Sequence, residues 1–234
     1  IPIQCIYRDG IWQVNGKYSQ TWRFADINYS LASYEDQRDM FTSYCGVLNS
    51  LPTDAVTKIT IYNRRLNSSD FQRSVLMQER GDTMDKYRRE YNQVLIEKAS
   101  ASNNLIQDKY ITVSVARKSA DEARAFFHRV DADLSKNLGR LDSGAKALDA
   151  YERLRIFHDF FRPGEEQFYK FDLGETMRLG RSFKDCIAPD GMKFLADHFE
   201  LGSKVGRVLF MRDYSSYIKD DMITSLADFP RPLV

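Results

Sequence analysis

Hydrophobic and polar residues follow two different rhythms along the first third of the chain. From Tyr18 to Phe24, large side chains occupy alternate positions, which predicts a β-strand. Residues 40–51 then carry apolar side chains at helical spacing, behind a Ser33–Asp36 pair in the pattern of a capping box. Residues 56–66 alternate again. A period that changes from 2 to 3.6 and back predicts a helix packed on a sheet.

The rest of the chain continues this mixture of strands and helices. The dipeptides Asp9-Gly10 and Asn15-Gly16 predict turns that divide residues 3–24 into a three-strand meander. Further along, the spacing predicts a short helix from Asn67, helices over 84–105, 119–138 and 146–161, a strand over 110–116, one or two short helices around 174–183, strands over 192–200 and 207–214, and a helix over 216–227.

These elements predict an α+β fold. The expected architecture is an antiparallel or mixed sheet in a ferredoxin-like βαβ arrangement with an inserted helical hairpin, followed by a second, smaller α/β part. Asp142-Ser143-Gly144 is the most plausible internal boundary, which gives subdomains of residues 1–141 and 142–234. The chain opens on Ile-Pro-Ile and stops at Arg-Pro-Leu-Val, so we expect it to be a segment of a longer protein.

Composition is that of an ordinary globular protein. The 34 basic and 33 acidic residues give a formal net charge of +1, so no overall field attracts nucleic acid or anionic lipid. Three widely spaced cysteines favour neither a disulfide framework nor a zinc knuckle, and a reducing cytosol is the simpler expectation. No stretch reaches the roughly 18 apolar residues that a membrane span needs.

Two glycine-containing loops resemble phosphate-binding sites but lack what the chemistry requires. In residues 139–146, Ala145 stands where the lysine of a P-loop belongs, and no Ser or Thr follows for Mg²⁺. The Gly202–Gly206 loop joins two predicted strands, so no helix N-terminus is positioned to bind a phosphate. We therefore expect no nucleotide, no cofactor and no metal in this chain.

Other catalytic patterns are equally weak. His128, His158 and His198 lie 30 and 40 residues apart, without the paired spacing of metal ligands. The adjacent carboxylates Glu165-Glu166 and Asp220-Asp221 point in different directions on any regular element. A hydrolase would require His158 or His198 to meet carboxylates in a closed pocket.

Aromatic and basic residues give the more useful surface predictions. Trp12, Trp22 and Tyr29 fit either core positions or a partner-docking surface, because Trp and Tyr serve both. A local basic cluster, Arg178, Arg181 and Lys184 beside Phe183, is the candidate for contact with nucleic acid.

Two stretches carry a likeness to a known family. The opening IYRDGIWQVNGKYSQTWRFADINYSLAS, followed by an amphipathic helix, and the closing SYIKDDMITSLADFPRPLV have no Walker loop between them. In this the chain resembles the amino-terminal domain of the VirB-four/TraC/TraE class of conjugative-transfer ATPases, especially those on mobile elements of Gram-positive gut bacteria. The likeness covers essentially the whole chain.

The resemblance implies a non-catalytic role in type IV secretion. In that family ATP and Mg²⁺ belong to a RecA-like carboxy-terminal domain, which would lie after Val234. The amino-terminal domain contacts inner-membrane subunits and helps to arrange a hexameric oligomer, at the cytoplasmic face of the membrane. The expected function is therefore assembly and docking, and the alternative is a nucleic-acid-binding module that uses Arg178, Arg181 and Lys184.

Overall fold

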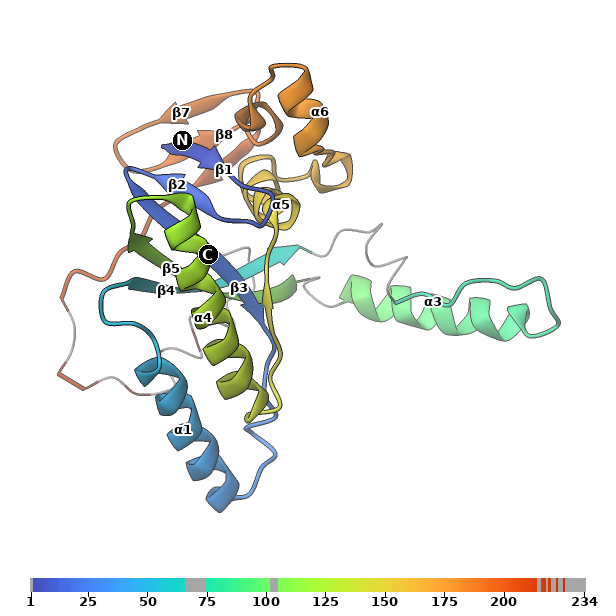
Figure 1. The fold of residues 1–234 in the computed structure, drawn as a ribbon. Helices are drawn as coiled ribbons and strands as arrows, with labels where there is room; N and C mark the ends of the chain where they lie inside the picture. The colour runs from blue at the N-terminus through green and yellow to red at the C-terminus, as the bar shows by residue number, and fades with distance from the viewer. Residues whose placement is uncertain are drawn as a thin grey trace. The chain divides into compact units, whose positions relative to one another are not determined.

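The fold is α+β, as the sequence predicts. The computed structural model describes residues 2–65, 75–101 and 105–213 and the isolated positions 216, 217, 219, 222 and 225. These residues form five α-helices, a six-strand antiparallel sheet and a small three-strand antiparallel sheet (Figure 1). The predicted short helix from Asn67 and most of the predicted helix over 216–227 lie outside the described residues.

The chain begins with the predicted three-strand meander, β1 (Ile3–Ile6), β2 (Trp12–Val14) and β3 (Lys17–Phe24). Asn15 and Gly16 connect β2 to β3 with φ angles of 50° and 74°, the positive values that a type I′ turn requires. The connection from β1 to β2 is longer, and within it Gly10 has a φ angle of 83°.

Strand β3 is the centre of the larger sheet. One of its edges pairs along residues 17–24 with β5 (Leu105–Ala116). The other edge is divided, because β2 pairs with residues 17–19 and β6 (Ala145–Ala147) pairs with residues 22–24. Strand β4 (Val56–Arg65) follows β5, which gives the order β1-β2-β3-β5-β4 with β6 beside β3.

Two helices, α1 (Tyr34–Asn49) and α4 (Ala120–Gly139), cover one face of this sheet (Figure 1). Each begins where the sequence predicts, since the side chains of Ser33 and Ser119 accept hydrogen bonds from backbone N–H groups three residues later. The core that they enclose is built from apolar side chains of β3, β5 and both helices, among them Trp22, Val47, Ile111, Val113, Phe127, Val130 and Leu134.

A second core lies on the opposite face of the meander. Tyr18 and Ser19 are successive residues of β3, so their side chains point to opposite faces of the sheet. Tyr18 belongs to the first core, and Trp12, which pairs with Ser19, belongs to the second. The segments that cover this side are α5 (Ala150–Phe161), η1 (Glu166–Phe168), α6 (Leu173–Arg178) and η2 (Phe183–Cys186). They enclose Ile3, Ile6, Trp12, Leu154, Tyr169 and Ile187.

Several predicted elements differ from the structure. The helix predicted over 84–105 ends at Ala101, and Leu105 begins β5, so the strand predicted over 110–116 starts five residues earlier. The helix predicted from 146 begins at Ala150, because Asp149 and Glu152 form a capping box and residues 145–147 pair with β3 instead. The predicted strand over 192–200 is a hairpin, β7 (Met192–Phe194) and β8 (Phe199–Leu201), which continues into β9 (Lys204–Gly206). Residues 207–213, predicted as a strand, have no regular secondary structure.

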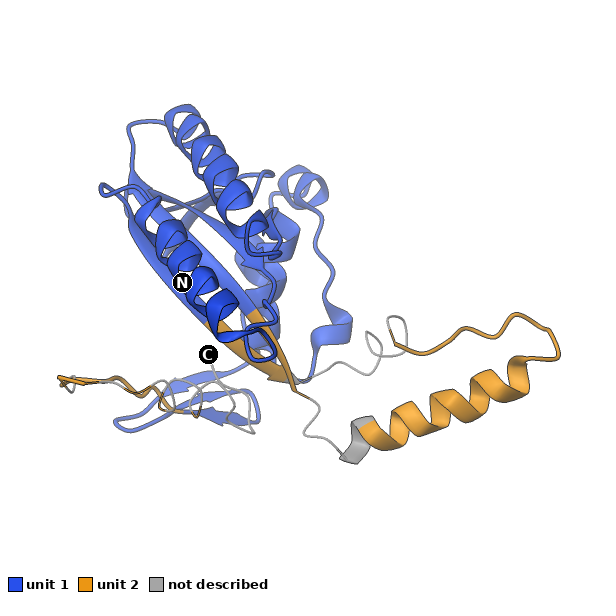
Figure 2. Cartoon of the chain, turned by 90° about the horizontal axis from the view of Figure 1, so that it is seen from below, with its two compact units in different colours: residues 1–60, 109–206 blue, residues 61–108, 207–234 orange. Residues whose placement is uncertain are grey.

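Contacts group the chain into two compact units (Figure 2). Unit 1 contains residues 1–60 and 109–206, and unit 2 contains residues 61–108 and 207–234. Helix α3 (Asp85–Ala101) belongs to unit 2. The boundary between residues 141 and 142 stays a prediction.

Candidate protein-docking surfaces

The two tryptophans proposed for docking are buried. Trp12 is 2% exposed, its ring centroid lies 4.9 Å from that of Phe157, and the Arg153 guanidinium lies 4.2 Å from the centroid of its indole. Trp22 is fully buried, and its Nε1–H donates a 2.7 Å hydrogen bond to Asp131 Oδ1. Both indoles therefore lie in the cores of unit 1 in this structure.

Tyr29, the third candidate, is 47% exposed and leads into a larger apolar surface. This surface, here called the α1 surface, consists of exposed apolar side chains on α1 and the segment before it: Tyr29, Leu31, Tyr34, Phe41, Tyr44 and Leu48. Tyr34 and Phe41 are 84% and 62% exposed. In a globular protein, several large apolar side chains gathered on one surface mark a site of interaction.

Helical geometry explains why α1 is apolar on two sides. Tyr34, Phe41 and Leu48 are seven residues apart and so lie along one stripe, while Met40 and Val47 face the first core. The apolar arc is therefore wider than the part that the sheet covers. The first turn and a half of the helix carries Glu35, Asp36 and Asp39 but only one cation, Arg38.

Helix α3 of unit 2 presents a second exposed stripe. Met84, Tyr87, Tyr91 and Val94, here called the α3 stripe, have exposed fractions between 47% and 61%. They follow one another at intervals of three, four and three residues. Met84 immediately precedes the helix, and Tyr87, Tyr91 and Val94 line one side of it.

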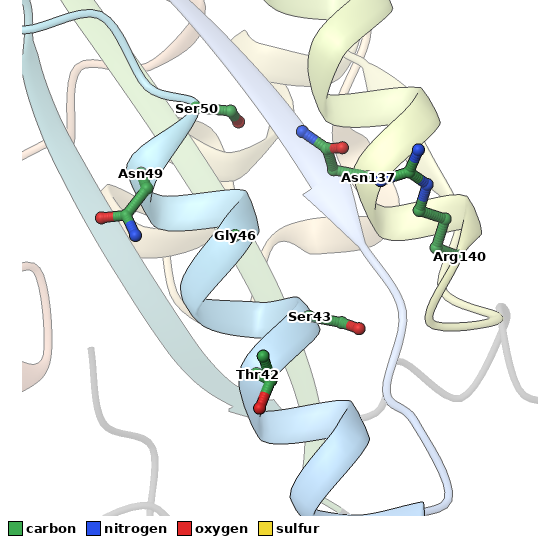
Figure 3. Close-up of a pocket in the computed structure, with 7 residues that line it drawn as sticks. All are labelled: Thr42, Ser43, Gly46, Asn49, Ser50, Asn137 and Arg140. Carbon is green, nitrogen blue, oxygen red and sulfur yellow. The ribbon is translucent and has the colours of Figure 1, made fainter.

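A polar groove lies between α1 and α4 (Figure 3). Its volume is about 510 Å³, and it is lined by Thr42, Ser43, Gly46, Asn49, Ser50, Asn137 and Arg140. Both helices end here, at Asn49 and Gly139, so the negative ends of their dipoles lie at the groove. This arrangement is unsuited to binding an anion such as phosphate, despite Arg140.

The predicted nucleic-acid residues form a short basic cluster in the second half of unit 1. Arg178 ends α6, Arg181 follows it, and Lys184 lies in η2 with its ammonium 6.0 Å from the Phe183 ring centroid. Both arginines are exposed. Three carboxylates occur in the same tract, at Asp172, Glu175 and Asp185, which reduces the local positive charge.

Among the described residues, the buried groups near His158 do not form a nucleophilic centre. His158 Nδ1 lies 3.2 Å from Asp159 Oδ1, and its ring lies 5.0 Å from that of Tyr169. Burial raises the pKa of the nearby Cys186 thiol to about 11, the opposite of what an attacking thiolate needs. Burial likewise raises the pKa of Tyr169, whose hydroxyl donates to the Tyr151 carbonyl.

His128 and His198 lie on other elements. His198 is near the surface beside Asp197, and its imidazole lowers the pKa of that carboxyl through a hydrogen bond. Among the described residues, no three His, Cys, Asp or Glu side chains are grouped to hold a metal ion. In the same part of the chain, no helix is long and apolar enough to cross a membrane.

Sequence reasoning did not identify the outward stripe of α1 or the exposure of residues 208–211. The first could have been found from the width of the apolar arc, which exceeds one helix face between Tyr34 and Leu51. The second is a run of four consecutive large apolar residues between Arg207 and Arg212, within the segment that the sequence predicts as a strand. Comparison with models of protein families gives no match, and comparison with curated proteins gives none either.

Proposed function

We propose that this chain is a non-catalytic assembly module that docks onto another protein through the α1 surface. The observation that carries the proposal is the exposure of six large apolar side chains on and before one well-capped helix. Covering them on binding would release on the order of 25 cal/mol for each square ångström of apolar surface removed from water. Such a surface therefore favours a lasting contact with another protein.

The α1 surface also indicates the chemistry of its partner. Glu35, Asp36 and Asp39 outnumber Arg38 at the N-terminal end of the helix, so a partner with basic residues beside an apolar patch is complementary. Three of the six apolar residues are tyrosines, a type that is enriched in protein interfaces.

The proposal extends to the machinery that the sequence resembles. We propose that the partner is an inner-membrane subunit of a type IV secretion machine, and that the chain works beside the ATPase domain of a conjugative-transfer protein at the cytoplasmic side of the membrane. ATP and Mg²⁺ would belong to that ATPase domain. The proposal includes the ferredoxin-like arrangement with an inserted helical arm. It is supported by the strand order β6-β3-β5-β4 with α1 after β3, α4 after β5 and α3 between β4 and β5.

A binding experiment with defined subunits tests this function. The purified chain is mixed with detergent-solubilised inner-membrane subunits of a type IV secretion machine, and the dissociation constant is measured. We expect Phe41→Glu to weaken binding by about tenfold or more, because it places a charge within an apolar interface. Met177→Glu, at a residue that is 73% exposed on α6, is the matched control and should bind like the wild type.

Two results would count against the proposal. One is equal binding by the wild type and Phe41→Glu, or no binding by the wild type. The other is calorimetric evidence that this chain alone binds ATP with micromolar affinity and turns it over.

The alternative function is nucleic-acid binding by Arg178, Arg181 and Lys184. It is favoured by the three basic side chains within seven residues, two of them exposed, next to an aromatic ring. A formal net charge of +1 weighs against it.

A further inference from the structure

The arm of unit 2, residues 75–98, is held together mainly by polar interactions. Asn92 donates from Nδ2 to the Met77 carbonyl at 2.8 Å and accepts from the Met77 N–H at 2.9 Å. These two bonds fix the segment before the helix against α3. They do so without using the side chains of the α3 stripe.

Carboxylates fix the start of the same helix. Asp85 accepts hydrogen bonds from the backbone N–H groups of Arg80 and Gly81, at 3.0 and 2.7 Å. Arg88 bridges Asp82 and Asp85, and its Nη2 lies 2.9 Å from Asp82 Oδ2. Hydrogen bonds from Arg88 and from the Met84 N–H lower the pKa of the Asp82 carboxyl, and hydrogen bonds from the Arg80 N–H, Arg88 and the Gly81 N–H lower that of Asp85.

The α3 stripe has the spacing of a helix-pairing seam. With Met84 and Tyr91 at heptad position a, Tyr87 and Val94 fall at position d. All four side chains are exposed, and three of them are on a helix whose beginning is already fixed. A second helix could therefore pack along this stripe with little ordering of the arm.

The charges beside the stripe select the partner. Glu90 and Glu97 occupy successive g positions along one border of the stripe. In the described part of the chain, the hydrogen bond that Glu97 accepts comes from the neutral side-chain amide of Gln93. Arg88, on the other border, is occupied by Asp82 and Asp85. Along the two borders of the stripe, the charge available to a partner is therefore acidic, whereas the exposed Lys98 lies in line with Met84 and Tyr91 at the next position a.

A second copy of the chain is a poor match for this pattern. Antiparallel pairing of two α3 helices sets the same border of each against the other, so that glutamate faces glutamate. Parallel pairing sets Glu90 against Leu95 and Arg88 against Thr83. Neither arrangement therefore sets an unoccupied cation against Glu90.

We infer that the α3 stripe binds an α-helix of a different protein, one with an apolar seam and lysine or arginine residues along one border. The seam covers Met84, Tyr87, Tyr91 and Val94, and the basic border pairs with Glu90 and Glu97. This site is in unit 2, whereas the α1 surface is in unit 1, so each can be tested while the other is intact.

Two synthetic helical peptides test the inference on the full chain. Both carry leucine at positions a and d, and they differ only in lysine or glutamate at the bordering e and g positions. Fluorescence anisotropy should show that the wild type binds the lysine peptide about tenfold more tightly than the glutamate peptide, since exposed ion pairs and like-charge contacts each contribute modestly. The double charge reversal Glu90→Lys with Glu97→Lys should invert that preference.

Apolar variants complete the design. Tyr91→Glu should abolish binding of the lysine peptide, and Met177→Glu should leave it unchanged, with circular dichroism confirming that both variants are folded. The inference is overturned if the wild type binds both peptides equally or neither, if charge reversal does not change the preference, or if the chain forms dimers that Tyr91→Glu disrupts. Loss of peptide binding together with intact, Phe41-dependent binding of the secretion subunits would reject this site and leave the proposed function standing.

Discussion

Around Gly10, side chains and backbone from distant parts of unit 1 meet within hydrogen-bonding distance. Arg153 Nη1 donates to the Gly10 and Ser19 carbonyls at 2.6 and 2.7 Å, and Gln20 Nε2 donates to the Leu148 carbonyl at 3.1 Å. Burial lowers the pKa of Arg153 to about 9, while the two carbonyls and the face of Trp12 favour its charged form. The turn is thus held in a closely packed polar junction.

Replacing Gly10 should therefore be more damaging than replacing another glycine with similar backbone angles. A Cβ at Gly10 would lie 1.9 Å from the Leu148 carbonyl oxygen, whereas at Gly16 nothing lies within 4 Å. We expect Gly10→Ala to lower the free energy of unfolding by about 3 kcal/mol, and Gly16→Ala by about 1 kcal/mol from backbone strain alone. Urea unfolding of both variants measures the difference, and equal losses would show that the contact with Leu148 is unimportant.

Cys186 should make the stability depend on alkaline pH. Because burial raises its thiol pKa from 9.0 to about 11, the folded protein holds this proton more tightly than the unfolded chain does. The contribution of the thiol is complete below pH 9 and is lost as the pH rises toward 11. Since the side chain is partly exposed, we expect the wild type to lose only about 1 kcal/mol more than Cys186→Ala over this interval.

Urea unfolding at several pH values between 9 and 11 follows this loss. Groups that do not interact with Cys186 affect both proteins equally, so the difference between them reports the thiol together with its effect on Tyr169. Parallel pH profiles for the wild type and Cys186→Ala would contradict the expectation.

At the scale of elements, the short strand β6 and the helix α5 share one junction. Asp149 Oδ1 accepts from the Glu152 N–H at 2.8 Å, and Glu152 Oε2 accepts from the Asp149 N–H at 3.1 Å. This capping box starts α5 immediately after β6 has paired with β3. The junction therefore connects the larger sheet to the helix that covers the second core.

Removal of the cap should weaken this connection. We expect Asp149→Ala to lower the free energy of unfolding by about 1 kcal/mol, because the first-turn N–H group of Glu152 loses its acceptor. Asp149→Asn keeps an acceptor oxygen and should cost less. Thermal unfolding followed by circular dichroism compares the two, and an equal loss in both would point to the charge of Asp149 rather than to its hydrogen bond.

Local patterns were sufficient to predict most of the regular elements but not how all of them pair. The strands of the meander and the beginnings of α1 and α4 follow from alternation, turn residues and serine caps, all of which act within a few positions. Strand β6 has only the sequence Ala-Lys-Ala, which is too short and too poor in β-branched or aromatic residues to indicate a strand. Its conformation is set by β3, more than 120 residues earlier, so it was assigned to the following helix.

The candidate surfaces were predictable only in part for a similar reason. Composition indicated an aromatic-rich protein, but whether a given ring is buried depends on which segments fold over it. Trp12 is covered by α5, which lies more than 130 residues away, whereas Tyr29 is left exposed beside α1. The apolar period of a helix does not reveal how much of its arc the sheet will cover.

For the whole molecule, the near balance of charge predicts weak contact with DNA. The formal net charge is +1, and any phosphate contacts would come from local groups such as Arg178, Arg181 and Lys184. We expect titration of a fluorescent duplex to give little binding, with an affinity that changes less than about tenfold between roughly 50 and 200 mM salt. The triple alanine variant of these residues should behave like the wild type, and a steep slope that it removes would favour the nucleic-acid alternative.

The divided edge of β3 has a consequence for synthesis on the ribosome. On this edge, residues 22–24 of β3 can form their backbone hydrogen bonds only after residues 145–147 have emerged from the ribosome. The Trp22 side chain likewise finds its hydrogen-bond acceptor only after Asp131 has emerged. At typical translation speeds of about 5–20 residues per second, a nascent chain would expose an open strand for on the order of ten seconds. During this interval, the unpaired strand edges of neighbouring nascent chains can pair with one another and aggregate. Slow codons between these two segments would therefore lower the yield of folded protein, and a chaperone that shields newly made strands would restore it.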